Sequence, residues 1–220
     1  MAQFERSEEE TIQAIKDWWK ENGRAVIAGV VLGIGGIVGV RYWFDHQQQI
    51  QHQASRAYST AQMALQSGNR ERAGKEVDTL MEEYDATAYA VLGALGMGRL
   101  ELEAGQPGSA ERYLRWALDN SDTGEYRHLA RQRLARLLLA EGQPEQAAEL
   151  LDGVDEAGYG SIYAEIRGDI AQAREQSSEA RGHYQQALLG AENALRRQLL
   201  EMKLAELSAV AEAPDSEVMP

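Results

Sequence analysis

The chain has 220 residues, of which 44% are hydrophobic and 7% aromatic, with 4 prolines and no cysteine. Its formal net charge of −13 disfavours nucleic-acid binding, because an acidic surface repels the phosphate backbone. Without cysteine there is neither a disulfide framework nor a thiolate metal site, and the scarcity of proline and aromatic residues favours an all-α protein.

Residues 1–24 are predicted to form a cytosolic segment with a separate short amphipathic helix. Ser7 and Glu10 have the spacing of a capping box, and Asn22-Gly23 is a typical helix stop. Three large apolar residues share one face of this helix: Ile12, Ile15 and Trp19. We expect this face to rest on the membrane interface; the alternative is a peptide that docks to a cytosolic partner.

Residues 25–44 (AVIAGVVLGIGGIVGVRYWF) carry no charge before Arg41. A cleaved signal is disfavoured, because its peptidase requires small residues where this segment has RYWF. A buried core helix is the other alternative. The pairs Trp18-Trp19 and Tyr42-Trp43 flank the segment as interfacial aromatic belts do, and a helix between them is roughly 35 Å long, which suits a hydrocarbon core of about 30 Å. We therefore predict an uncleaved transmembrane signal-anchor helix.

Basic residues near the two ends of this span predict its orientation. Lys16, Lys20 and Arg24 precede the span, and Arg41 is the one basic residue that follows before Arg56. The positive-inside rule therefore places the N-terminus in the cytoplasm and residues 45–220 on the far side of the membrane. In a bacterium this describes a single-pass protein of the inner membrane with a periplasmic C-terminal domain.

Small residues recur along the span at the spacing that lets two membrane helices approach closely. The candidate packing face consists of Ala25, Gly29, Gly33, Gly35 and Gly39. The alternative is that these glycines have no partner, because glycine is generally more frequent in membrane helices than in soluble ones.

Residues 45–210 contain an internal repeat. Helical patterns reach a glycine and resume five residues later with an alanine, at Gly68 and Ala73, Gly105 and Ala110, and Gly142 and Ala147. A fourth unit has Ala180 but lacks the turn glycine. The four alanines are 37, 37 and 33 residues apart, which brackets the tetratricopeptide period of about 34 residues.

This spacing predicts about four helical hairpins that stack into an α-solenoid. Glycine ends the first helix of a hairpin and alanine lies where the two helices cross, while the residue four positions later packs behind it. The small partners on the first helices are Ala61, Gly98, Ala135 and Gly168. Residues 191–210 are expected to form a capping helix, and residues 211–220 have the composition of a disordered tail.

The sequence contains no catalytic or metal-binding motif beyond what chance would produce. The four histidines are far apart, and His46 and His52 do not have metal-ligand spacing. Gly93, Gly96 and Gly98 lack the strand that a phosphate-binding loop requires. We therefore expect no enzymatic activity, no cofactor and no metal.

Binding to a peptide or partner is the better-supported function of the repeats. Repeat geometry predicts a groove lined by first helices, whose main residues are Tyr58, Gln62, Leu95, Arg99, Gln132, Arg136, Leu139 and Glu165. Arg99 and Arg136 occupy equivalent places in successive repeats, where they could hold a carboxylate or an acidic peptide. The alternative is that both are ordinary solvated arginines.

The layout as a whole resembles the YfgM family of ancillary subunits of the bacterial SecYEG translocon. The resemblance is carried by WWKENGR at residues 18–24, by the glycine-rich span that ends in Tyr42-Trp43, and by the acidic tetratricopeptide-like domain. It implies association with SecYEG and with a membrane-anchored periplasmic chaperone of the prolyl-isomerase type, and assistance to newly exported, unfolded proteins. It also implies a link to an envelope-stress response regulator. The alternative function is an adaptor for another envelope machine, such as the one for cell-wall synthesis.

Overall fold

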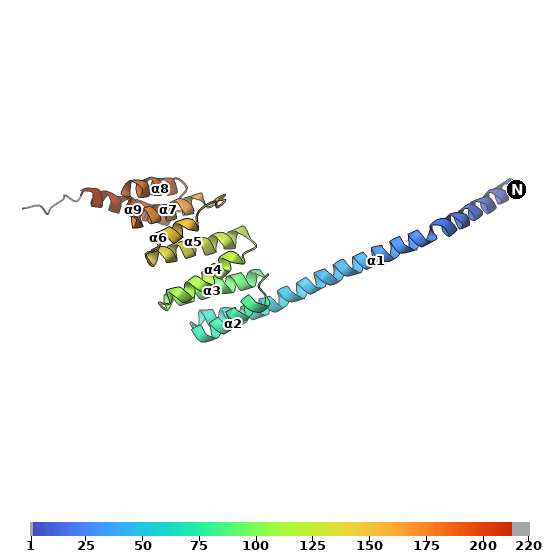
Figure 1. Cartoon of the computed structure of the whole chain (residues 1–220), viewed down its shortest axis with the longest axis horizontal. Helices are drawn as coiled ribbons and strands as arrows, with labels where there is room; N and C mark the ends of the chain where they lie inside the picture. Colours follow the sequence, from blue (N-terminus) through green and yellow to red (C-terminus); the bar gives the residue numbers. More distant parts are fainter. Residues whose placement is uncertain (1, 213–220) are drawn as a thin grey trace, which may run out of the picture. The chain divides into compact units, whose positions relative to one another are not determined.

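A computed structural model describes residues 2–212 and, within them, the side chains of residues 11–24 and 26–208. The described residues form helices without strands, as predicted (Figure 1). The helices are α1 (Ala2–Gln66), α2 (Arg70–Glu83), α3 (Ala88–Glu103), α4 (Pro107–Asp119), α5 (Gly124–Ala140), α6 (Pro144–Glu149), α7 (Gly160–Ala173), α8 (Ser177–Leu189) and α9 (Ala194–Glu212). The predicted capping box at Ser7 and Glu10 lies outside the described side chains, and so do all side chains of the predicted tail, residues 211–220.

Contacts divide the chain into two units, residues 1–53 and residues 54–220. In the first unit, the predicted helix stop at Asn22-Gly23 is wrong, because α1 continues through it. The Asn22 side-chain amide donates to the carbonyl oxygen of Trp18 at 3.1 Å, which keeps it within the helix. Gly23 lies under the Trp19 ring, where a Cβ atom would be 3.2 Å from the indole. The glycine therefore gives room to a tryptophan instead of ending a helix.

The apolar segment of α1 is long and apolar enough to cross a membrane, and none of its apolar window is buried inside the protein. Ile27, Leu32 and Ile37 are all more than half exposed. The alternative of a buried core helix therefore finds no support in the described residues, whereas a lipid environment would bury these side chains.

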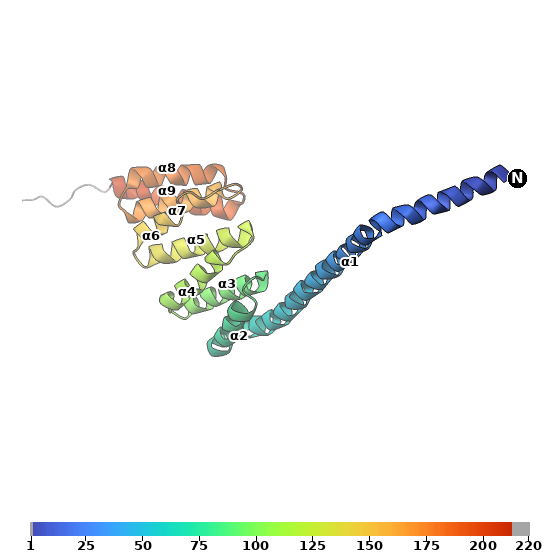
Figure 2. The same cartoon turned by 45° about the vertical axis from the view of Figure 1, so that its right-hand side comes forward.

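The second unit is a stack of helical hairpins, as the repeat spacing predicts (Figures 1 and 2). Residues 54–66 of α1 and helix α2 form the first hairpin, followed by α3 with α4, α5 with α6, and α7 with α8. Helix α9 follows α8 as the cap. Each hairpin buries one face against the next, which is how repeats too small to fold alone acquire a continuous core.

The four hairpin turns share one conformation. Gly68, Gly105 and Gly142 have φ angles of 69°, 69° and 71°, and Glu175 takes the same place in the fourth turn with φ of 62°. In every turn the next residue donates its N–H to the carbonyl five residues back, for example Gln106 to Glu101 at 2.9 Å. This is the Schellman arrangement, which satisfies carbonyls at a helix end and requires a left-handed residue.

Within each hairpin, small residues allow the close crossing that the sequence indicates. Each left-handed turn residue is followed five positions later by an alanine without exposed surface: Ala73, Ala110, Ala147 and Ala180. A Cβ atom at Gly98 would lie 3.0 Å from Leu114, and one at Gly168 would lie 2.4 Å from the Tyr184 ring. The crossing points are therefore filled by the large residue of the partner helix.

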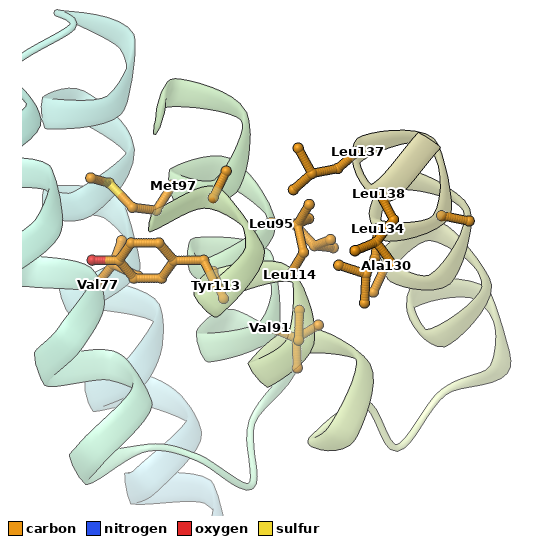
Figure 3. Close-up of a cluster of buried hydrophobic side chains, with 14 of the residues drawn as sticks. Val77, Val91, Leu95, Met97, Tyr113, Leu114, Ala130, Leu134, Leu137 and Leu138 are labelled. Carbon is orange, nitrogen blue, oxygen red and sulfur yellow. The ribbon is translucent and has the colours of Figure 1, made fainter. Parts of the chain in front are cut away.

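The core consists of two clusters of buried residues. The larger one extends from Ala61 to Ile170, and Figure 3 shows part of it, with Leu95 and Leu114 facing Leu134 and Leu138 of α5. The smaller cluster joins α7, α8 and α9 around Tyr184 and Leu200. Helix α7 contributes to both clusters, so it is the element that connects them.

The third hairpin departs from the regular pattern. Helix α6 has only six residues, and the chain from Leu150 to Tyr159 is irregular. Gly153 and Gly158 have φ angles of 66° and 81°, which a regular helix does not allow. The sequence DGVDEAG at residues 152–158 is rich in poor helix formers, which explains why the second helix ends early.

Candidate functional site

Two pockets lie on the surface formed by the first helices of the hairpins. The N-terminal pocket, of about 490 Å³, is lined by α1 and α3 through Gln62, Leu65, Gln66, Gly68, Gly96, Arg99, Leu100 and Glu103. The C-terminal pocket, of about 430 Å³, is lined by α5, α7 and α9 through Arg136, Leu139, Ala140, Asp169, Gln172, Ala173 and Lys203. Gln62 and Arg99, predicted to share the groove, line one pocket, and Arg136 and Leu139 line the other.

Arg99 is exposed, and binding a ligand would break only one weak ion pair. Its side chain is 73% exposed, and its Nε donates to Oε1 of Glu103 one turn later at 2.7 Å. An exposed pair of this kind contributes only about 0.3–0.5 kcal/mol. A carboxylate that binds Arg99 in two-pronged geometry could therefore displace Glu103.

Arg133 adds positive charge next to Arg99, which the sequence reasoning missed. Its Nη1 donates to the carbonyl oxygen of Leu95 at 3.2 Å, so this hydrogen bond goes to an uncharged group. Burial and then the charge of Arg99 lower the pKa of Arg133. Two guanidinium groups that repel each other form a local site that an anion would stabilise.

The prediction that Leu95 lines the groove is wrong. Leu95 is only 3% exposed, and in Figure 3 it points toward Leu134 and Leu137 of α5. The following hairpin covers it, because Arg133 of α5 also reaches back to its carbonyl. Helical spacing identified the right face of α3 but not the part of that face that α5 occupies.

The prediction for Glu165 is wrong for a related reason. Glu165 is 4% exposed and accepts from Arg196 Nη2 at 3.0 Å and Lys203 Nζ at 3.2 Å, both on α9. Arg136 Nη2 lies 3.8 Å from it. Glu165 therefore holds the capping helix in place and is not available to a ligand.

The other two predicted groove residues, Tyr58 and Gln132, are in the lining of neither pocket. Tyr58 is partly buried, and its ring lies 5.7 Å from that of Tyr89, in a tilted arrangement. Burial raises the pKa of the Tyr58 phenol. Gln132 is also partly buried, and the linings of the two pockets do not include it.

A third cavity, of about 550 Å³, lies between the start of α5 and the irregular chain after α6. Its lining includes Arg127, His128 and Arg131 on α5 and Asp152 and Asp155 opposite. This cavity was not predicted from the sequence. The signal that could have found it is the pair of glycines at 153 and 158, which predicts a break in the helix and hence a loop that folds back over α5.

His128 lines this cavity and is held there by two tyrosines. Its Nδ1 lies 2.6 Å from the Tyr163 hydroxyl, and its ring stacks on Tyr159 with 4.0 Å between centroids. Burial, followed by the charge of Arg131, lowers the pKa of His128. These contacts keep the neutral imidazole packed between two helices, which is a structural role.

The predicted packing face of the membrane span carries no side chains that block an approach. An added Cβ atom at Gly29, Gly33, Gly35 or Gly39 would meet nothing within 4 Å among the described residues. The side chain of Ala25, the fifth member, is outside the described set.

No metal site is formed by the described residues, which contain no group of three or more histidine, aspartate or glutamate side chains placed to hold an ion.

Comparison with known proteins identifies relatives over nearly the full chain. Residues 16–209 match the family described as tetratricopeptide repeat-like domain. Proteins named ancillary SecYEG translocon subunit are similar in Haemophilus influenzae (31% identical, covering 91% of this chain and 97% of the relative) and Aggregatibacter actinomycetemcomitans (32% identical, 91% and 97%). The protein of that name in Escherichia coli is 25% identical, covering 92% of this chain and 97% of its own. No solved structure matches the chain.

Proposed function

This chain belongs to the family of ancillary SecYEG translocon subunits, whose common domain is tetratricopeptide repeat-like, and on that premise we propose that it is a membrane-anchored scaffold of the Sec translocon. The observation that carries the proposal is the match to four proteins of that name, each over about nine tenths of this chain. The stacked helical hairpins fit this role, because such arrays bind partners along an extended surface.

We propose that the protein spans the inner membrane once, with its N-terminus in the cytoplasm and its repeats in the periplasm. The excess of basic residues before the span supports this orientation. The apolar segment of α1, exposed along its length, supports the anchor. In this arrangement the repeats meet exported proteins as these leave the channel.

The glycine face of the span is the proposed contact with another membrane helix. Gly29 and Gly33 lie one turn apart without a neighbouring side chain, so a partner helix could approach their backbone closely. The candidate partners are a helix of the channel and the anchor of a periplasmic chaperone of the prolyl-isomerase type, which the family resemblance implies.

The two first-helix pockets are the proposed sites for exported chains or acidic partner segments. Arg99 with Arg133 in one region, and Arg136 in the other, provide cationic groups next to apolar Leu65 and Leu139. Such sites favour peptides with acidic and apolar residues side by side. A link to an envelope-stress response regulator, implied by the family resemblance, would use the same surface.

The translocon proposal is tested by purifying the tagged full chain from membranes in mild detergent and blotting for SecYEG. The matched variant has residues 25–44 replaced by a polyleucine span of equal length, which still inserts. A narrower variant is Gly29→Leu with Gly33→Leu, and its control is Val31→Leu with Val38→Leu on the opposite face. We expect the channel to co-purify with the native chain and the valine control but not with the other two.

The pocket proposal is tested by photo-crosslinkers at positions 99 and 136, with position 186 as a control on the exposed second helix α8. We expect adducts with exported proteins or the chaperone at the first two positions and none at the third. If the adducts are instead with cell-wall synthesis enzymes, and SecYEG does not co-purify, the alternative function as an adaptor for that machine replaces the proposal.

A further inference from the structure

The capping helix α9 repeats the register of the first helices of earlier hairpins. Arg127 on α5 donates to the carbonyl of Ser121, and Arg197 on α9 donates to the carbonyl of Ala191, six residues earlier in both cases. This correspondence aligns Leu199 with Leu129, and Met202 with Gln132. Helix α9 is therefore a first helix that no described helix follows.

On the earlier helices, the equivalent positions are covered by the next first helix. Leu95 on α3 is buried under α5, and Glu165 on α7 is buried under α9. The residue in that place on α9 is Met202, which is 56% exposed. Leu199, one turn earlier, is 40% exposed, and Leu195, two turns earlier, is 79% exposed. These three apolar side chains lie at helical spacing on one face of α9. Together with Glu206 they form a surface that we name the end face.

Charges next to this face indicate what kind of helix would fit it. On α7, Asp169 is paired with Lys203 of the following helix at 2.5 Å. The residue in the equivalent place on α9 is Glu206, which is exposed and makes no ion pair in the part of the chain that the structure describes. The next helix would therefore need apolar residues for the leucines and methionine, and a lysine or arginine for Glu206.

We propose that the end face binds an amphipathic helix of a partner protein, with an apolar stripe flanked by basic residues, as the next first helix of the array. A second copy of the chain fits poorly. Antiparallel pairing of two α9 helices about Leu199 brings Glu206 opposite Glu192, and both copies carry a net charge of −13. The end face is distinct from the two first-helix pockets, so this inference does not depend on the proposed function.

The test uses the full chain in nanodiscs of uncharged lipid and two designed helical peptides, which have the same leucine stripe but lysine or glutamate flanks. Fluorescence anisotropy measures their affinities. We expect the lysine-flanked peptide to bind at least about tenfold more tightly than the glutamate-flanked one. Leu199→Gln with Met202→Gln should weaken its binding by about tenfold or more. The matched control is Met63→Gln, because Met63 is 59% exposed at the other end of the array.

Glu206→Lys provides a second, independent readout, because it should reverse the preference in favour of the glutamate-flanked peptide. Arg99→Ala with Arg136→Ala should leave binding of the lysine-flanked peptide unchanged and should remove any binding of the glutamate-flanked peptide at the two first-helix pockets, which separates the end face from the pockets. The proposal is overturned by equal binding to native and Leu199→Gln/Met202→Gln chains, by an unchanged charge preference in Glu206→Lys, or by dimers of the native chain that the end-face variant abolishes. SecYEG co-purification has no bearing on these outcomes.

Discussion

Gly168→Ala should destabilise the repeat domain, although alanine is the better helix former. A Cβ atom at this position of α7 would lie 2.4 Å from both Cδ1 and Cε1 of Tyr184. Carbon atoms in contact prefer about 3.5–4.0 Å, so the ring would have to move by more than about 1 Å. The substitution therefore tests whether Tyr184 can move.

The surroundings of Tyr184 oppose such a movement. Its hydroxyl lies 2.8 Å from Oδ1 of Asp169 and 2.6 Å from Oε1 of Gln172, and Lys203 Nζ lies 5.2 Å from the ring centre. Overpacking a filled core costs about 1–3 kcal/mol. Replacing a helical glycine by alanine recovers about 0.5–1 kcal/mol. Because the ring is both fully buried and held at its hydroxyl, we expect a net loss of about 2 kcal/mol.

The measurement is a urea titration of the full chain in nanodiscs, followed by far-ultraviolet circular dichroism. The control is Gly182→Ala on α8, where an added Cβ atom meets nothing within 4 Å. This variant should gain about 0.5–1 kcal/mol. Combining Gly168→Ala with Tyr184→Leu should cost less than the sum of the two single changes. Equal effects of Gly168→Ala and Gly182→Ala would refute the close-packing explanation.

Three further substitutions test other parts of the domain. Glu165→Gln should cost about 3 kcal/mol in the same titration, because it leaves Arg196 and Lys203 without their shared buried carboxylate; an unchanged midpoint would show that the network contributes nothing. Glu175→Gly should gain about 0.5–1 kcal/mol by removing a side chain from a left-handed residue, and a loss would contradict the turn assignment. The pKa of His128 is lowered in the folded chain, so the unfolded chain binds more protons at this residue. The free energy of unfolding should therefore fall as the pH drops below about 6.5. His128→Gln should remove that part of the pH dependence, and a native chain that instead gains stability between pH 7 and 5 relative to the variant would refute the sign.

The regular part of the fold was predictable because each repeat carries its own local signals. Glycine at a helix end and alanine at a helix crossing act over a few residues, so the periods of 37 and 33 residues were enough to predict the hairpins and the cap. The fourth turn shows the limit of such signals. Glu175 adopts the left-handed conformation without being glycine, because the packed helices on both sides fix the turn.

The candidate site was less predictable, because it depends on how successive hairpins cross. Arg99 and Arg136 line two separate pockets on the first-helix surface, whereas repeat position predicted one groove that contains both. Leu95 and Glu165 lie on the same predicted face but are covered by the following helix. Periodicity within one helix determines its faces, but the coverage of a face is set by a neighbour that is more than 30 residues away in the chain.

Gly23 shows the same limitation at the N-terminus. Asn-Gly commonly ends a helix, yet here the asparagine bonds back to Trp18 and the glycine lies beneath Trp19. Local propensity was outweighed by a side chain one turn away. The length of α6 is the converse case, because Gly153 and Gly158 ended a helix that the repeat pattern alone would have continued.

The division of the core into two clusters affects the order in which the helices of the array unfold. Helices α8 and α9 are attached through the smaller cluster, and the larger cluster reaches no further than α7. Helices α8 and α9 can therefore unfold together as a cooperative unit while the first three hairpins stay folded. Native-state hydrogen exchange should accordingly show amides of α8 and α9 opening together, at a lower free energy than those of α3 and α5. A protease added under native conditions would trim the chain from this end.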